Sequence, residues 1–174
     1  MRKSESAVRK ELTAALPDIR RFAYSLTGAR ADADDLLQAT VERILDKGAP
    51  EDADMKKWSY RVAKNIWIDE IRSRRVRRRA VSEGKIDIND RLDGERVVLG
   101  SISLAEVNRA MERLPDDQRA ALALVAVEGL SYADAAEALE VPIGTVMSRI
   151  SRARAALADI FAAPKAPLAA GAVE

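Results

Sequence analysis

Apolar side chains recur three and four residues apart through most of this sequence, and runs of alternating apolar and polar residues are missing. The first pattern places apolar side chains on one face of an α-helix, whereas alternation would be typical of a β-strand. The spacing therefore predicts an all-α protein.

Turn and helix-ending residues divide this periodic sequence into short helices. Pro17, Thr27-Gly28 and Gly48-Ala49-Pro50 are the breaks expected in the first half. The predicted helices are 5–16, 17–27, 31–47 and 55–79, followed by 103–113, 116–128, 131–139 and 142–162.

The stretch 81–102 contains several glycine, aspartate and asparagine residues and lacks a sustained apolar stripe. A structureless loop of this length is uncommon within one compact domain. We therefore predict two small helical domains, 1–80 and 103–162, each with a modest core and joined by a flexible linker at 81–102. The segment 163–174, rich in alanine and proline, is predicted to be a disordered tail.

The chain contains no cysteine and no histidine. Disulfides, thiolate nucleophiles, histidine bases and the usual zinc ligands are therefore excluded. We expect no catalytic residue, no metal site and no cofactor. The beginning of the sequence is polar, and no apolar stretch is long enough for a signal peptide or a membrane span, so we expect a cytoplasmic protein without membrane insertion.

Basic charge is concentrated in the first half of the sequence. Residues 1–80 contain 19 Lys and Arg against 13 Asp and Glu, whereas residues 103–174 contain 7 against 10. Six of the eight residues from Arg72 to Arg79 are arginines. This density favours binding to a phosphate backbone, although a solvated basic helix end would give the same pattern.

The segment 131–142 has the features of a helix-turn-helix. Ser131 and Asp134 form a capping-box pattern, with a hydroxyl followed three residues later by a carboxylate. Pro142 suits the first turn of the next helix, where a missing N–H costs nothing. The short connection between these two helices is typical of DNA-binding proteins.

The helix predicted at 142–162 has two distinct faces. Its apolar residues, spaced four and three apart, are Val146, Ile150, Ala153, Leu157 and Ile160. The opposite face carries Gly144, Ser148, Ser151, Arg152 and Ala155, with Thr145, Arg149 and Arg154 beside it. Small and hydrogen-bonding side chains on one face favour a helix that reads a DNA major groove. An ordinary three-helix bundle with a polar outer face remains an alternative.

Segments 114–119 (LPDDQR), 128–132 (EGLSY) and 144–154 (GTVMSRISRAR) resemble the fourth conserved region of extracytoplasmic-function (ECF) sigma factors of RNA polymerase. In that family this region recognises the minus-thirty-five promoter element. The resemblance implies that role for Thr145, Ser148, Arg149, Ser151, Arg152 and Arg154.

Segment 32–41 (DADDLLQATV) resembles the second conserved region of the same family. The resemblance implies that Asp34, Asp35 and Gln38 dock on the clamp of the largest polymerase subunit, and that the second domain meets the flap of the second subunit. The helical period independently predicts an inward stripe and leaves the acidic residues available to a basic partner. That stripe consists of Leu36, Leu37, Thr40, Ile44 and Leu45.

Segment 58–72 (WSYRVAKNIWIDEIR) is similar to the family's segment for recognising and melting the minus-ten element. The residues implied to bind that DNA are Arg61, Lys64, Asn65, Arg72, Arg74 and Arg75. A cationic face with an amide suits single-stranded DNA. Trp58 and Trp67 fall on the apolar side, where we expect them to be core residues.

These resemblances identify the chain as a sigma factor that binds core RNA polymerase and promoter DNA, and they also imply an anti-sigma partner. One alternative is a free-standing helix-turn-helix regulator that needs no polymerase. A more remote alternative is a magnesium-dependent nucleic-acid enzyme using Asp34, Asp35 and Asp69, although no phosphate-binding glycine loop accompanies these residues.

Overall fold

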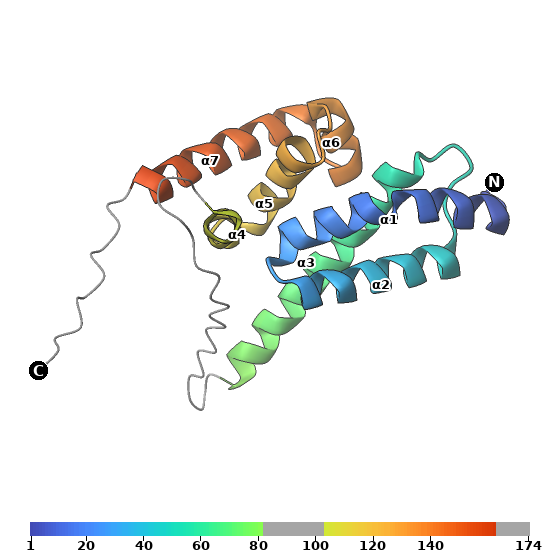
Figure 1. Cartoon of the computed structure of the whole chain (residues 1–174), viewed down its shortest axis with the longest axis horizontal. Helices are drawn as coiled ribbons and strands as arrows, with labels where there is room; N and C mark the ends of the chain where they lie inside the picture. The colour runs from blue at the N-terminus through green and yellow to red at the C-terminus, as the bar shows by residue number, and fades with distance from the viewer. Residues whose placement is uncertain (82–102, 163–174) are drawn as a thin grey trace, which may run out of the picture.

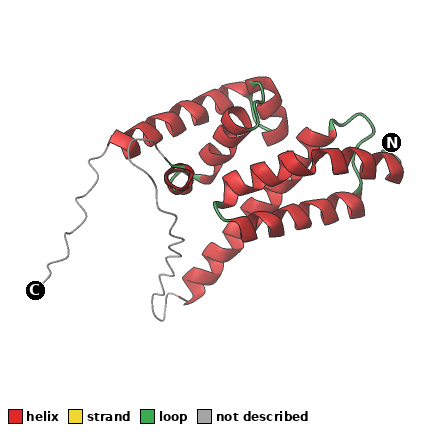
Figure 2. Cartoon of the chain, in the orientation of Figure 1, coloured by secondary structure: helices red, strands yellow, loops and turns green. Residues whose placement is uncertain are grey.

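The computed structural model describes residues 1–81 and 103–162. Within these two ranges every regular element is a helix and no strand forms (Figure 2). The all-α prediction is therefore confirmed. The predicted linker from residue 82 onward and the predicted tail at 163–174 lie outside the described residues.

Three helices form the N-terminal domain (Figure 1): α1 (Glu5–Thr27), α2 (Arg30–Lys47) and α3 (Met55–Val81). Helix α1 begins where the Ser4 hydroxyl accepts a hydrogen bond from the Ala7 amide at 3.3 Å. It ends at Gly28, whose φ of 75° is left-handed and therefore favours glycine. Each of the three helices packs against the other two.

Pro17 does not separate two helices, as the sequence had predicted, but lies inside the continuous helix α1. An interior proline costs about 3 kcal/mol because it removes one helical hydrogen bond and crowds the preceding turn. Leu12, Ala15 and Ile19 are buried on both sides of it in one uninterrupted stripe. Burial of that stripe outweighs the local cost and keeps the helix continuous.

The C-terminal domain contains four α-helices, α4 (Leu104–Glu112), α5 (Asp116–Leu122), α6 (Tyr132–Leu139) and α7 (Ile143–Ala162). Helix α5 continues into one π-helical segment, η1 (Ala123–Val127). Ser103 begins α4 with a capping box, since its hydroxyl accepts from the Glu106 amide at 3.1 Å and the Glu106 carboxylate accepts from the Ser103 amide at 2.9 Å.

The larger hydrophobic core crosses from one domain to the other. Phe22 and Trp67 of the N-terminal helices share one cluster with Leu124 and Val146 of the C-terminal helices. A smaller cluster, which includes Val8 and other residues of α1, is confined to the N-terminal domain. Helices α4, α5 and η1 contact α1, and α6 contacts α3, so the two domains pack directly on each other (Figure 1).

Candidate nucleic-acid and polymerase interfaces

The turn between α6 and α7 has the predicted helix-turn-helix form. The Ser131 hydroxyl accepts from the Asp134 amide at 3.0 Å and donates to the Asp134 carboxylate at 2.8 Å. The Asp134 carboxylate therefore contacts the capping hydroxyl. Glu140 ends α6 with a left-handed φ of 57°, and Pro142 immediately precedes Ile143, the first residue of α7.

Helix α7 presents the two faces predicted from its sequence. Val146, Ile150 and Ala153 are buried, and Leu157 and Ile160 are half-buried. The opposite face is open to solvent, and its residues are Gly144, Met147, Ser148, Ser151, Arg152, Arg154 and Ala155. Exposed small and polar side chains along one side of a helix are what contact with a major groove requires.

The cations of α7 differ in their surroundings. Arg149 is half-buried and donates to the Asp117 carboxylate at 3.1 Å. Arg152 is exposed and makes no hydrogen bond or ion pair with any described residue. Thr145 is half-buried at the first turn, and Arg154 is exposed. Arg152 can therefore reach a ligand without breaking an existing contact.

Helix α3 packs through its two tryptophans, as predicted, and also through Tyr60. Trp67 is buried and Trp58 is half-buried, which confirms that both are packing residues. Tyr60 is fully buried, which helical periodicity did not predict, and its ring meets Phe22 edge-on with 5.0 Å between ring centroids. The Tyr60 hydroxyl is available to bond across the domain interface.

The residues predicted to bind the minus-ten strand do not form one open face. Arg61 donates to the Glu137 carbonyl of α6 at 2.8 Å, and its guanidinium lies 3.7 Å from the Glu140 carboxylate. Lys64 is half-buried, and desolvation lowers its pKa. Only Asn65, among these neighbours, is exposed.

The arginine run at the end of α3 is exposed and partly paired. Arg72 is exposed. Arg74 forms an ion pair with Glu70 one turn earlier, and Arg75 donates to Asp116 of α5 at 2.7 Å. The last of these pairs links the two domains.

Helix α2 exposes the three residues predicted to dock on polymerase. Asp34 accepts two hydrogen bonds from Arg20 of α1, at 2.8 and 3.1 Å. The Gln38 amide donates to Glu42 at 3.0 Å. Asp35 lies at a cavity of about 150 Å³ between α1, α3 and α5, which Arg119 also lines.

The inward stripe of α2 differs from the prediction at one end. Leu36, Thr40 and Ile44 are buried, and the Thr40 hydroxyl donates to the Leu36 carbonyl at 2.7 Å. Leu45 is 40% exposed, because Ala33 and not Leu45 completes the buried row at the helical period. Including Leu45 in the core was therefore wrong.

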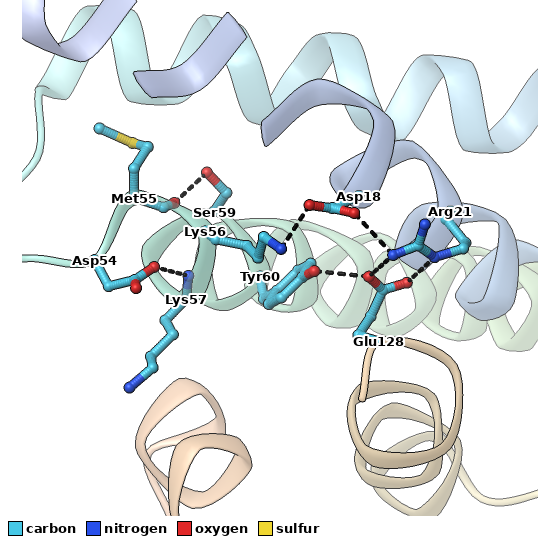
Figure 3. Close-up of polar contacts among 9 residues, drawn as sticks. All are labelled: Asp18, Arg21, Asp54, Met55, Lys56, Lys57, Ser59, Tyr60 and Glu128. Atoms are coloured by element: carbon cyan, nitrogen blue, oxygen red, sulfur yellow. Dashed lines mark hydrogen bonds and ion pairs between the residues drawn. The ribbon is translucent and has the colours of Figure 1, made fainter. Parts of the chain in front are cut away.

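A polar cluster between the domains was not predicted from the sequence (Figure 3). The Glu128 side chain is 0% exposed and accepts hydrogen bonds from Arg21 at 3.0 and 2.7 Å and from the Tyr60 hydroxyl at 2.7 Å. Asp18 accepts from Arg21 at 2.8 Å and pairs with Lys56 at 2.7 Å. Burial, and then the bond to Glu128, raises the pKa of the Tyr60 phenol.

Arg119 of α5 makes a second buried contact between the domains. Its guanidinium is over the Trp67 ring, 5.5 Å from the centroid, and donates to the Leu26 carbonyl at 2.8 Å. That carbonyl belongs to the last turn of α1, where a cation is favourable. Desolvation lowers the pKa of Arg119, which is only 8% exposed.

The described part of the chain contains no group of three or more acidic residues close enough to hold a metal ion. Asp69 is exposed on α3, whereas Asp34 is paired with Arg20. No helix within residues 1–81 or 103–162 is long and apolar enough to cross a membrane.

The sequence matches two family descriptions, one for each domain. Residues 12–77 match sigma-70 region 2, and residues 104–157 match sigma-70 region 4. These segments coincide with the α1–α3 and α4–α7 parts of the structure.

Similar proteins extend this match over most of the chain. This chain is 34% identical over 158 residues to the ECF RNA polymerase sigma factor EcfG of Rhodopseudomonas palustris, and the alignment covers 89% of this chain and 85% of that protein. It is 37% identical over 142 residues to SigC of Mycobacterium tuberculosis, covering 80% and 75%. The Bartonella quintana sigma factor RpoE, solved with the anti-sigma factor NepR, has a TM-score of 0.73 at 29% identity and covers 90% of this chain and 98% of that one. The chain therefore belongs to the ECF RNA polymerase sigma factors.

Proposed function

We propose that this chain binds core RNA polymerase through α2 and directs it to promoters by reading two DNA elements. The observation that carries the proposal is the order of the two sigma regions along one chain. The first region exposes an acidic face on α2, and the second exposes a face of small and polar side chains on α7. The protein works in the cytoplasm as a transcription initiation factor, and the covalent chemistry belongs to the polymerase.

The polymerase contact is assigned to Asp34, Asp35 and Gln38 on α2. All three are exposed along one side of the helix, opposite the buried row. Carboxylates in this position favour a basic partner and act mainly on the rate of encounter. In the free chain, Arg20 holds the Asp34 carboxylate in place through an ion pair.

Promoter reading is assigned to α7 and α3. The exposed face of α7 contacts the upstream element, with Ser148 and Arg152 toward the bases and Arg154 beside them. Helix α3 contacts the downstream element and its opened strand through Arg61, Lys64, Asn65 and the arginines that follow. Opening DNA costs a few kcal/mol per step, which these contacts and the polymerase must offset.

An anti-sigma protein is the proposed regulator. The similar Bartonella quintana sigma factor was solved in complex with one. A groove lined by Leu16, Pro17, Leu37 and Leu104 and edged by arginines runs along α1 and α2, and its chemistry suits an amphipathic segment with acidic residues.

The deciding experiment measures affinity for core RNA polymerase and compares Asp34→Asn with Arg20→Ala. Both variants remove the same ion pair, but only the first removes the proposed docking carboxylate. Asp34→Asn should weaken binding, most clearly at low salt, because exposed charges are screened as salt rises. Arg20→Ala should bind as well as the original chain or better, because its carboxylate is no longer shared.

Equal losses in the two variants would show that the ion pair only supports the fold. A free-standing regulator would bind duplex promoter DNA tightly and specifically without polymerase at physiological salt. That result, with no promoter-directed transcript from the reconstituted polymerase, would overturn the proposed function.

A further inference from the structure

We propose that Met147, together with Ile143 one turn earlier, recognises the C5-methyl group of a thymine in the upstream promoter element. The methyl contact rests on the promoter-reading function proposed for α7 and adds an apolar contact to the polar ones. It specifies which base the first turns of α7 select.

Two large apolar side chains are exposed at the beginning of α7. Ile143 is 48% exposed and Met147 is 51% exposed. They are four residues apart, so they lie on one side of the helix, one turn after the other. At about 100° per residue, both border the open face that carries Gly144 and Ser148, and Met147 is nearer to the middle of that face. A single exposed apolar residue is ordinary, whereas this pair lies on the part of the helix that enters a groove in helix-turn-helix proteins.

Polar side chains in the same turns are already engaged within the protein. The Ser148 hydroxyl donates to the Thr145 carbonyl at 3.1 Å, and Arg149 donates to the Asp117 carboxylate at 3.1 Å. Met147 is unbranched and has a polarisable thioether, so its side chain adapts to an irregular surface. The first two turns of α7 therefore present a largely apolar contact to a partner.

Gly144 is a second sign that a partner approaches the helix here. Its φ is not positive, and a Cβ added to it would meet nothing within 4 Å beyond its immediate helical neighbours. Neither the backbone conformation nor the packing therefore requires glycine, although glycine weakens a helix. The missing side chain lets another molecule come close to the backbone. A helix that lies this deep in a groove brings Met147, almost one turn later, to the base edges.

The chemistry of the major groove decides what this apolar pair contacts. Phosphates and most groups on the base edges are polar, and an apolar side chain that displaces their water does not replace the lost hydrogen bonds. The C5-methyl of thymine is the apolar group that a base pair presents in this groove. Contact between Met147 and that methyl removes apolar surface from water on both sides and is favourable.

The deciding experiment removes only this methyl group from the DNA. The full chain is combined with core polymerase, and the preferred upstream element is identified from a library with a constant minus-ten element. Each thymine of that element is then replaced by deoxyuridine, which keeps base pairing and the polar groups of the groove. At one or two positions the replacement should lower the affinity of the holoenzyme about fourfold, as expected for one buried CH₂-sized group.

Variants of Met147 identify the side chain that makes the contact. Met147→Gln has a similar length but is polar, and it should bind thymine and deoxyuridine promoters equally. Met147→Leu stays apolar and should keep most of the discrimination. Phe161→Ala is the matched control, because Phe161 is 39% exposed on the same helix. It lies about 21 Å further along α7, beyond the width of a groove, so this variant should discriminate as the original chain does.

Gly144→Ala gives an independent readout of the close approach. The added Cβ has room in the free protein, so the variant should unfold at the same or a higher denaturant concentration. Its holoenzyme should nevertheless bind the upstream element more weakly, because the helix is held further from the DNA. A position that only supports the fold would not change these two quantities in opposite directions. Unchanged promoter binding would overturn the close approach on which the methyl contact depends.

Equal affinity for thymine and deoxyuridine at every position, measured with the original chain, would overturn the proposal. Discrimination that survives in Met147→Gln would do so as well, because another side chain then makes the contact. A loss of affinity for core polymerase in Met147→Gln, measured without DNA, would place Met147 on the polymerase instead. Failure of the proposed function is a different result, namely no promoter-directed transcript from the original chain with core polymerase. A chain that transcribes normally without sensitivity to deoxyuridine loses only the methyl contact.

Discussion

Replacing Arg152 with alanine tests whether α7 reads bases or only rests on the DNA backbone. Arg152 is exposed on the outer face of α7 and has no hydrogen-bond or ion-pair partner within the described chain. Its loss should therefore change the free energy of unfolding by no more than about 0.5 kcal/mol, as for most surface substitutions. Any larger effect on transcription then reports on the DNA complex.

The size of the effect follows from the chemistry of the contact. A guanidinium that bonds two acceptors of a guanine contributes about 1 to 3 kcal/mol of discrimination against other bases. This energy corresponds to about 5- to 150-fold at the base pair concerned. Arg149 is a poorer candidate, because it must first leave Asp117, and such partly exposed pairs contribute up to about 1 kcal/mol.

The assay is transcription by reconstituted polymerase from a library of upstream elements with a constant minus-ten element. Arg152→Ala should relax the preference at one or two positions. Arg154→Ala is the matched control, because it removes an exposed arginine two residues away and should weaken all promoters evenly if it contacts only phosphate. A uniform loss across the library in Arg152→Ala would refute base reading by this residue.

Two further predictions concern stability and pH. Pro17→Ala should raise the free energy of unfolding by about 2 kcal/mol in a denaturant titration, because the regained helical propensity of about 3 kcal/mol exceeds the entropy that proline removes from the unfolded chain. No gain would mean that the interior proline does not destabilise α1. The hydrogen bond from Lys57, followed by that from Ser131, lowers the pKa of Asp134. The Asp134 carboxylate therefore contributes to folding stability above its ordinary pKa of about 3.9, and this contribution is lost as pH falls through the lowered pKa. The free energy of unfolding should therefore fall in acid, and Asp134→Asn should reduce that fall in denaturant titrations over the same pH range.

The parts of the fold that the sequence predicted are those set by neighbouring residues. Val146, Ile150 and Ala153 are buried because their spacing alone puts them on one side of a helix. Ser131 and Pro142 act through their own backbone groups, and the helices begin where expected. Such signals are local and do not depend on what the chain packs against.

The features that sequence missed depend on contacts between distant segments. Glu128 and Tyr60 are 68 positions apart, and nothing in either neighbourhood indicates that a carboxylate will be buried against a phenol. The helix break predicted at Pro17 is wrong for the same reason. Tertiary burial of the apolar stripe of α1 overrides the local helix-breaking signal of proline, and the helix continues through it. Arg61 and Lys64 were placed correctly on one helix, but the neighbour that covers them could not be identified from helical periodicity.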